Sequence, residues 1–329
     1  MDFTRDHDSV TERAPSAGPT GGVPRWRRYV AVGDSFTEGL WDLPDGAAPQ
    51  TLDVPGLGGA PQVRCRGWAD LLAGHLADRV AGTSAGSGTA PGAGAGPGAG
   101  AGPTAHDAVD GPGRPGSESF RYANLAVRGR LLGHIAREQV PAAATLGPDL
   151  VSLVGGGNDL LRLGADPDAL AETLEGAVVG LRRAGVDVLL ATGFDCAQSP
   201  VIRRTRGSTA ILNAHIWTIA RRHGAFVLDM WGMRSLRDWR MWSDDRIHLT
   251  TDGHRRIAQA ALVALGLPPD DEHWDDPLAP LPPLPVAARV RADAVWLRTH
   301  VSPWVARHLR GRSSGDGLAP KRPTLEPMG

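Results

Sequence analysis

Residues 28–36, RYVAVGDSF, contain the pattern from which the fold is inferred. It is a run of β-branched and apolar residues that ends in Gly-Asp-Ser, which is typical of a buried strand entering a tight turn. Four later stretches have the same character, and we predict a strand in each: FRYANLAV (120–127), DLVSLVGGGND (149–159), VDVLLAT (186–192) and AFVLDM (225–230).

Helical patterns separate these strands. Apolar residues recur at helical spacing in four segments, 67–81, 168–185, 208–223 and 251–267, and a further helix follows the second strand to about residue 144. Strands that are apolar throughout and alternate with helices indicate a parallel sheet covered on both faces. We therefore predict one three-layer α/β domain over residues 28–267, with its ligand site beyond the carboxyl ends of the strands.

The segments around and within this domain have a different composition. We expect a disordered leader at 1–27, a flexible Gly/Ala-rich insertion at 82–116, a proline-rich connector at 268–285, an amphipathic helix with interspersed arginines at 286–310, and a disordered tail at 311–329.

The bulk composition excludes some classes of function. The net charge of -1 gives no electrostatic argument for a nucleic-acid partner. Two distant cysteines, Cys65 and Cys196, are too few for a disulfide-built fold, and we interpret them as unpaired thiols, although one bridge is possible. The chain has no signal-peptide pattern and no run of about 18 apolar residues. We expect a cytoplasmic protein without stable membrane insertion.

Three short motifs fall where strands end. Ser35 follows the first strand, and its hydroxyl is either exposed as a nucleophile or caps the next helix. Gly129 has no Cβ, so its N–H can approach a ligand, unless the glycine serves only a loop with positive φ. Asn158 follows a run of three glycines and can donate to an oxyanion or cap a helix.

A fourth motif pairs an acid with a base. Asp245 precedes His248 by three residues, just before the last helix, so the carboxylate can hold the imidazole ring in one tautomer. The alternative is an ordinary surface pair at a helix entry. A nucleophile, oxyanion donors and an oriented base in one chain, all at predicted strand ends, favour the catalytic interpretation.

Together the four motifs resemble those of the SGNH hydrolases, the GDSL esterase/lipase family, named for residues that correspond here to Ser35, Gly129, Asn158 and His248. The forms GDSxTxG and DxxHLTxxGH are also similar to those of the family. The resemblance covers roughly residues 28–267. It implies a flavodoxin-like fold with a five-stranded parallel sheet of order 2-1-3-4-5, and hydrolysis of acyl esters without a metal or cofactor.

We accordingly expect hydrolysis of a small-molecule carboxylic ester, acyl or O-acetyl. Ser35 attacks, His248 accepts its proton, and Asp245 orients the imidazole. The backbone N–H groups of Ser35 and Gly129 and the side chain of Asn158 hold the oxyanion.

The substrate contacts are less defined. Trp231, Trp239 and Trp242 precede the base and, with Asp34, are candidates for the substrate pocket. Packing of the three indoles onto the domain is the alternative. The arginines at 128 and 130, on either side of Gly129, favour either an anionic substrate or simple solvation, and we prefer solvation.

Two other classes of function remain as alternatives. In one, a weakly active domain acts as an interaction or membrane-surface protein through the helix at 286–310. In the other, the domain binds a nucleotide or flavin. The second is disfavoured because Gly-Asp-Ser stands where G-x-G-x-x-G is required.

Overall fold

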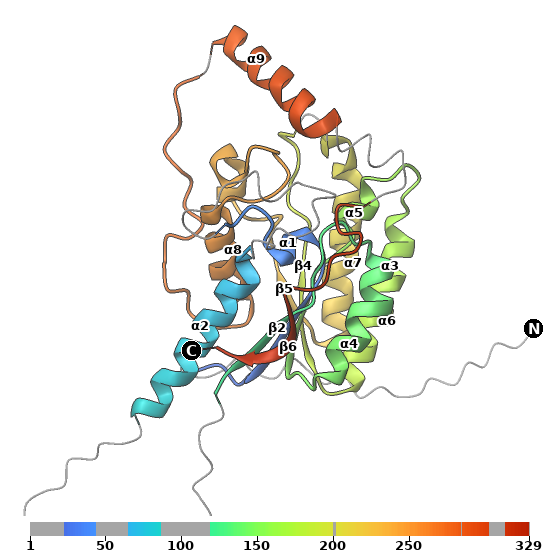
Figure 1. The fold of residues 1–329 in the computed structure, drawn as a ribbon, viewed down its shortest axis with the longest axis vertical. Coiled ribbons are helices and arrows are strands. Elements are labelled where there is room, and N and C mark those ends of the chain that lie inside the picture. The colour runs from blue at the N-terminus through green and yellow to red at the C-terminus, as the bar shows by residue number, and fades with distance from the viewer. Residues whose placement is uncertain are drawn as a thin grey trace, which may run out of the picture.

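The computed structural model describes six ranges of the chain: 23–43, 65–86, 119–199, 202–283, 285–302 and 313–328. These residues form a mixed α/β fold in which a mostly parallel sheet lies between two layers of helices (Figure 1). The predicted three-layer α/β class is therefore confirmed. Most of the expected leader and most of the expected Gly/Ala-rich insertion lie outside the described residues.

The sheet has the strand order β5-β4-β3-β1-β2-β6. Its strands are β1 (Arg28–Val32), β2 (Arg121–Asn124), β3 (Leu150–Leu153), β4 (Asp187–Ala191), β5 (Phe226–Leu228) and β6 (Arg322–Pro327). The first five are parallel, which confirms the order 2-1-3-4-5. The strand count was wrong, because β6 adds an antiparallel sixth strand beside β2.

The alternation of side chains along β1 explains why both faces need helices. Tyr29 and Ala31 belong to one apolar core, whereas Val30 and Val32 belong to the other. Successive side chains of a strand point to opposite faces, so a strand that is apolar throughout requires cover on both sides.

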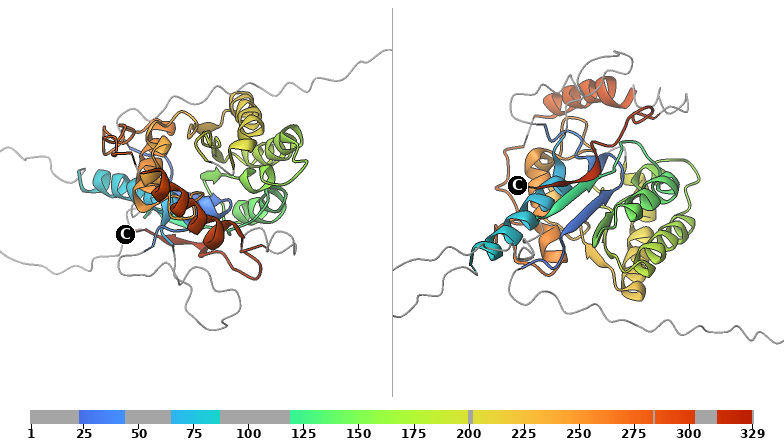
Figure 2. Two further views of the ribbon diagram at one scale, coloured as in Figure 1. Left: turned by 90° about the horizontal axis from the view of Figure 1, so that it is seen from above. Right: turned by 60° about the horizontal axis from the view of Figure 1, so that its bottom comes forward.

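Each face of the sheet has its own helical layer (Figures 1 and 2). One layer consists of α2 (Gly67–Gly86) and α8 (Thr251–Ala264). The other consists of α3 (Leu132–His134), η2 (Ile135–Gln139), α4 (Val140–Thr145), α6 (Pro167–Arg183) and α7 (Arg206–His223). Short elements sit around the carboxyl ends of the strands: α1 (Ser35–Glu38), α5 (Gly157–Leu160), η3 (Ile202–Thr205), η4 (Ser235–Arg237) and η5 (Trp239–Met241).

The chain beyond residue 267 departs from expectation in part. The expected helix at 286–310 is present as α9 (Val286–Trp296) and η6 (Leu297–Val301), and 303–312 lie outside the described residues. The tail at 311–329 was wrongly expected to be disordered, since β6 pairs with β2. Two prolines within its six residues hide this strand in the sequence.

Smaller expectations have mixed outcomes. Helix α2 continues to Gly86, five residues into the segment expected to be flexible. Cys65 and Cys196 are both free and buried, as the interpretation of unpaired thiols requires. No helix among the described residues has the length and apolar character needed to cross a bilayer.

Candidate active site

The turn after β1 presents Ser35 at the carboxyl edge of the sheet. Ser35 is the first residue of α1, and Asp34 is the N-cap, whose Oδ1 accepts a hydrogen bond from the N–H of Phe36 at 3.0 Å. The helix is therefore capped by Asp34, which leaves the hydroxyl of Ser35 available for another partner.

That partner is the imidazole of His248. The Nε2 atom of His248 lies 2.8 Å from the Oγ of Ser35, and its Nδ1 lies 2.6 Å from Oδ2 of Asp245. The structure thus brings three residues from opposite ends of the domain into one hydrogen-bonded line. This is the geometry that a serine nucleophile, a general base and an orienting acid require.

The Asp245 carboxylate is held by donors on both oxygens. Oδ1 accepts from the hydroxyl of Ser243 at 2.7 Å and from the N–H groups of Ile247 and His248, both at 2.9 Å. Oδ2 accepts from the indole N–H of Trp41 at 2.7 Å, in addition to its bond with His248. The carboxylate is fixed as an acceptor and cannot rotate without losing several bonds at once.

This environment shifts two pKa values in opposite directions. Burial opposes ionisation of Asp245, but the charge and hydrogen bonds of His248 outweigh it and hold the pKa of Asp245 well below its ordinary value. Burial also opposes the imidazolium, and the carboxylate of Asp245 outweighs that effect and raises the pKa of His248 above its ordinary value. The pair therefore favours the charged imidazolium that a base becomes after accepting a proton.

Two backbone N–H groups are candidates for an oxyanion site. Those of Ser35 and Gly129 donate no hydrogen bond to any other described residue. Gly129 has a left-handed φ of 71°, which a residue with a Cβ rarely adopts. The required glycine and its open N–H are consistent with the expected donor.

The side chain of Asn158 is already engaged. Its Nδ2 donates to Oδ2 of Asp34 and to the carbonyl oxygen of Arg130, both at 3.1 Å. Donation to an oxyanion would therefore require Asn158 to exchange or share one of these acceptors. Asn158 also fixes the carboxyl of Asp34, whose pKa burial raises to about 6.

A cavity of about 420 Å³ opens beside this site. Its walls include Ser35, His248, Gly129 and Asn158, together with apolar side chains from α5, α7 and the loops after β2 and β3. Trp296 and His300 from the C-terminal helices and residues 313, 314 and 316 from the tail complete the lining.

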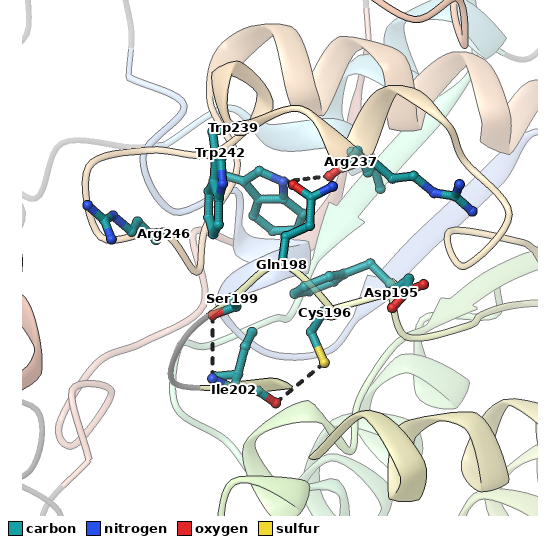
Figure 3. Close-up of a pocket in the computed structure, with 11 residues that line it drawn as sticks. Asp195, Cys196, Gln198, Ser199, Ile202, Arg237, Trp239, Trp242 and Arg246 are labelled. Atoms are coloured by element: carbon teal, nitrogen blue, oxygen red, sulfur yellow. Dashed lines mark hydrogen bonds between the residues drawn. The ribbon is translucent and has the colours of Figure 1, made fainter. Parts of the chain in front are cut away.

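The three tryptophans expected at the substrate pocket are not part of this lining. Trp242 is buried against Phe194, with ring centroids 4.3 Å apart, and donates its indole N–H to the carbonyl of Leu236. Trp239 and Trp242 line a separate, much smaller pocket (Figure 3). Trp231 lies next to the guanidinium of Arg206. Among the expected substrate contacts, only Asp34 lines the large cavity, because the segment containing the indoles packs onto the domain.

The two arginines beside Gly129 have different environments. Arg128 is buried and bonds the carboxylate of Glu38 through its side chain and its backbone N–H, the latter at 2.7 Å. The interpretation of a solvated side chain is wrong for Arg128. Arg130 is more exposed, its guanidinium lies 3.6 Å from the carboxylate of Glu138, and it lines the large cavity.

Two indoles contact Asp245 although no pattern in the sequence pairs them with it. Trp41 adopts a left-handed φ of 76° and donates to the carboxylate of Asp245. Trp296 donates its indole N–H to the carbonyl of the same residue at 3.0 Å. Both lie outside the motif blocks, and neither spacing nor periodicity relates them to Asp245. Among the described residues, no group of His, Cys, Asp and Glu is arranged to hold a metal ion.

Comparison with known families identifies the class of protein. The sequence profile of the GDSL-like Lipase/Acylhydrolase family matches residues 86–256, more than half of the chain. The chain belongs to this family. The matched range includes Gly129, Asn158, Asp245 and His248, whereas Ser35 precedes it. Membership of the GDSL-like family supports a hydrolase that acts on esters.

Solved structures similar to this GDSL-like chain are distant in sequence. LAE5, an α/β hydrolase enzyme from the metagenome of Lake Arreo, is 21% identical over 73% of this chain and 95% of its own, with a TM-score of 0.49. TesA is 18% identical over 73% and 98%, with a TM-score of 0.45. A catalytic mutant of Axe2, an acetylxylan esterase from Geobacillus stearothermophilus, is 18% identical over 73% and 94%, with a TM-score of 0.45. No curated protein sequence matches the chain.

Proposed function

We propose that this chain is a serine esterase that cleaves carboxylic esters of small molecules, with Ser35 as nucleophile, His248 as general base and Asp245 as the orienting acid. The observation that carries the proposal is the continuous hydrogen-bonded line from Oγ of Ser35 through the imidazole to the carboxylate, with distances of 2.8 and 2.6 Å. The line ends at the wall of the large cavity, where an ester has room to bind.

In the first half of the reaction, Oγ of Ser35 attacks the acyl carbon and its proton passes to Nε2 of His248. The carbonyl π electrons move to the oxygen, which becomes the oxyanion of the tetrahedral intermediate. The intermediate collapses, the bond to the alcohol oxygen breaks, and His248 gives that oxygen the proton. An acyl-serine and a free alcohol result.

In the second half, water attacks the acyl-serine and transfers a proton to His248. The second tetrahedral intermediate releases the carboxylic acid, and Ser35 regains its proton from the imidazolium. In both halves Asp245 stabilises the charged imidazole without itself taking a proton.

The oxyanion is assigned to the N–H groups of Ser35 and Gly129, with Asn158 as third donor. Two facts support the backbone groups: they lie on the cavity wall, and neither donates to another described residue. Donors that are fixed before the reaction stabilise the developing charge without reorganisation.

The acyl portion is assigned to the apolar side of the cavity. Its lining there includes Val154 and Leu160 after β3 and Leu212 and Ile216 on α7. An acyl chain buried against such side chains gains about 0.8 kcal/mol for each methylene removed from water.

Replacement of the nucleophile tests the proposal. Ser35→Ala should lower turnover of p-nitrophenyl acyl esters by about 10⁴-fold or more while the far-UV circular dichroism spectrum stays unchanged. Ser119→Ala is a matched control. Ser119 is exposed and lies just before the amino end of β2, whereas the site lies at the carboxyl ends of the strands. Near-wild-type turnover by purified Ser35→Ala protein would disprove the assignment.

A further inference from the structure

The tail at 313–328 lies against the proposed oxyanion loop. Strand β6 pairs with β2, with Tyr122 opposite Glu326 and Asn124 opposite Arg322. Strand β2 runs directly into the loop that carries Gly129, so the tail is joined to the element that delivers this glycine to the site (Figures 1 and 2).

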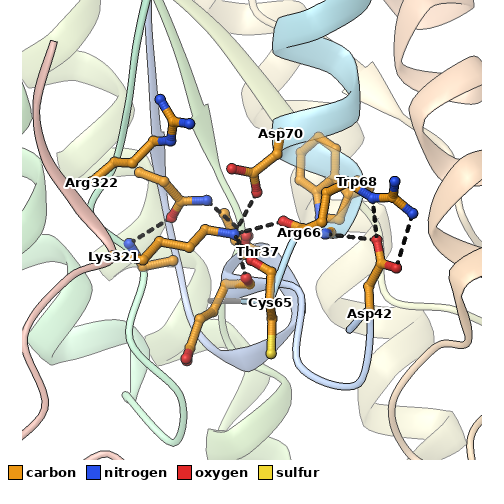
Figure 4. Close-up of polar contacts among 12 residues, drawn as sticks. Thr37, Asp42, Cys65, Arg66, Trp68, Asp70, Lys321 and Arg322 are labelled. Carbon is orange, nitrogen blue, oxygen red and sulfur yellow. Dashed lines mark hydrogen bonds and ion pairs between the residues drawn. The ribbon is translucent and has the colours of Figure 1, made fainter. Parts of the chain in front are cut away.

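Lys321, the only lysine of the chain, anchors the tail at the start of β6. Its side chain is only 9% exposed, and its ammonium group donates to the carbonyl oxygens of Glu38, Cys65 and Arg66 at 2.6, 2.7 and 2.6 Å (Figure 4). It also contacts the carboxylate of Asp70. Glu38 is the last residue of α1, the helix that begins with the nucleophile, so this anchor ties the tail to the nucleophile turn.

Before Lys321, the turn at 313–317 packs onto the backbone of the oxyanion loop. The hydroxyl of Ser313 donates to the carbonyl of Gly129 at 3.3 Å. Gly315 approaches so closely that a Cβ on it would lie 1.9 Å from the carbonyl oxygen of Arg128. The turn is itself fixed, since Asp316 accepts from the N–H of Ser313 at 2.9 Å.

The contact of Gly315 with the Arg128 carbonyl bears on the direction of the Gly129 N–H, because both groups belong to one peptide. The carbonyl of Arg128 and the N–H of Gly129 belong to one planar trans peptide, in which these two groups point in opposite directions. Gly315 packs against the carbonyl side of this peptide, and the cavity is lined by Gly129. Any rotation that displaces this carbonyl also turns the N–H of Gly129 away from its direction.

We propose that the turn at 313–317 is a positioning element of the active site, which holds the N–H of Gly129 toward the oxyanion, and that Lys321 keeps this turn in place. The inference rests on the proposed function, because it requires the oxyanion role of Gly129. It assigns a catalytic purpose to a segment outside the four motif blocks.

Gly315→Ala is the test, with Gly74→Ala as matched control on α2, where an added Cβ meets nothing within 4 Å. The added methyl of Gly315→Ala must displace either the turn or the Arg128 carbonyl. We expect kcat to fall by about 10- to 100-fold, with KM nearly unchanged, as for partial loss of an oxyanion donor.

A trifluoromethyl ketone provides a readout that a purely structural role does not alter. Its adduct with Ser35 carries a tetrahedral oxyanion, so its affinity for Gly315→Ala should fall by the same factor as kcat, whereas the affinity for the product acid should not change. An unchanged kcat, or a loss of kcat without the matching loss of ketone affinity, would overturn the proposal.

A second variant decides the matter if Gly315→Ala does not fold. Lys321→Met combined with Asp70→Asn removes the anchor without leaving a buried unpaired carboxylate, and the same selective loss of kcat is expected. Wild-type kcat in this folded variant would contradict the proposal. If Ser35→Ala is inactive while these variants keep full activity, only the positioning role fails. If Ser35→Ala is active, the proposed function itself fails.

Discussion

Two buried aspartates interact with the imidazole of His248, Asp245 through a hydrogen bond and Asp34 through its charge, and their environments shift their pKa values in opposite directions. Asp245, before α8, accepts from five groups and has a pKa well below its ordinary value. Asp34, after β1, is also buried, yet among the described residues it accepts hydrogen bonds only from Phe36 and Asn158, and its pKa is raised to about 6. Burial by itself acts to raise the pKa of both carboxyls, so the difference comes from the groups that bond each one.

The opposite pKa shifts indicate different roles for Asp245 and Asp34. A carboxylate that stays ionised at any pH of interest can stabilise an imidazolium throughout the reaction cycle. A carboxyl with a pKa near 6 changes charge close to the range in which a histidine titrates. We therefore expect Asp245 to determine the basicity of His248, and Asp34 to hold the N-terminus of α1 and the amide of Asn158.

The largest expected effect comes from removing the charge of Asp245. Asp245→Asn should lower kcat/KM by about 10⁴-fold. The remaining burial lowers the pKa of His248, so the rising limb of the kcat/KM profile should move to lower pH. The wild-type limb, by contrast, should lie above the ordinary histidine value of 6.5, because activity requires the neutral imidazole. A profile unchanged by Asp245→Asn, measured from pH 4 to 9, would refute the assigned partnership.

A smaller effect is expected at Asn158, the residue that joins Asp34 to the oxyanion loop. Asn158→Ala should lower kcat by about 10²- to 10³-fold with little change in KM. Steady-state kinetics on one p-nitrophenyl ester separates the two constants. An effect on KM alone would assign Asn158 to substrate binding and leave the oxyanion to the backbone donors.

The smallest expected effect is that of Trp41, which donates to Oδ2 of Asp245, the oxygen that also bonds the imidazole of His248. Trp41→Phe leaves more negative charge on that oxygen, so the pKa of His248 should rise and the activity limb should move to higher pH, opposite to Asp245→Asn. We expect kcat to fall by about 5- to 10-fold, in line with the loss of one hydrogen bond to a charged group. A limb that moves to lower pH would show that Trp41 acts through packing alone.

The sequence predicted those parts of the molecule that depend on local pattern. Uniformly apolar strands and amphipathic helices predicted the parallel sheet and its two helical layers. The position of the four motifs at strand ends predicted that Ser35, Gly129, Asn158 and the Asp245–His248 motif lie close together. The contacts of the indoles before the last helix could not be predicted from the sequence. Aromatic composition indicates burial, but it does not indicate which surface a ring contacts. Trp242 fills the core, while Trp296, 51 residues after Asp245, contacts the acid.

Strand β6 was not predicted, for a related reason. An edge strand of six residues, of which Pro323 and Pro327 are two, has no pattern of its own, and it pairs with the free edge of β2. The anchoring role of Lys321 depends on three carbonyl groups from two distant segments, which no spacing in the chain reveals.

Chemical labelling of the nucleophile is a direct test of the role proposed for Ser35. A fluorophosphonate should modify the active protein once per chain, and mass spectrometry of the digested protein should place the adduct on Ser35. The reaction should disappear in Ser35→Ala and slow strongly in Asp245→Asn. An adduct on another serine, or an active protein that the reagent does not modify, would contradict the account.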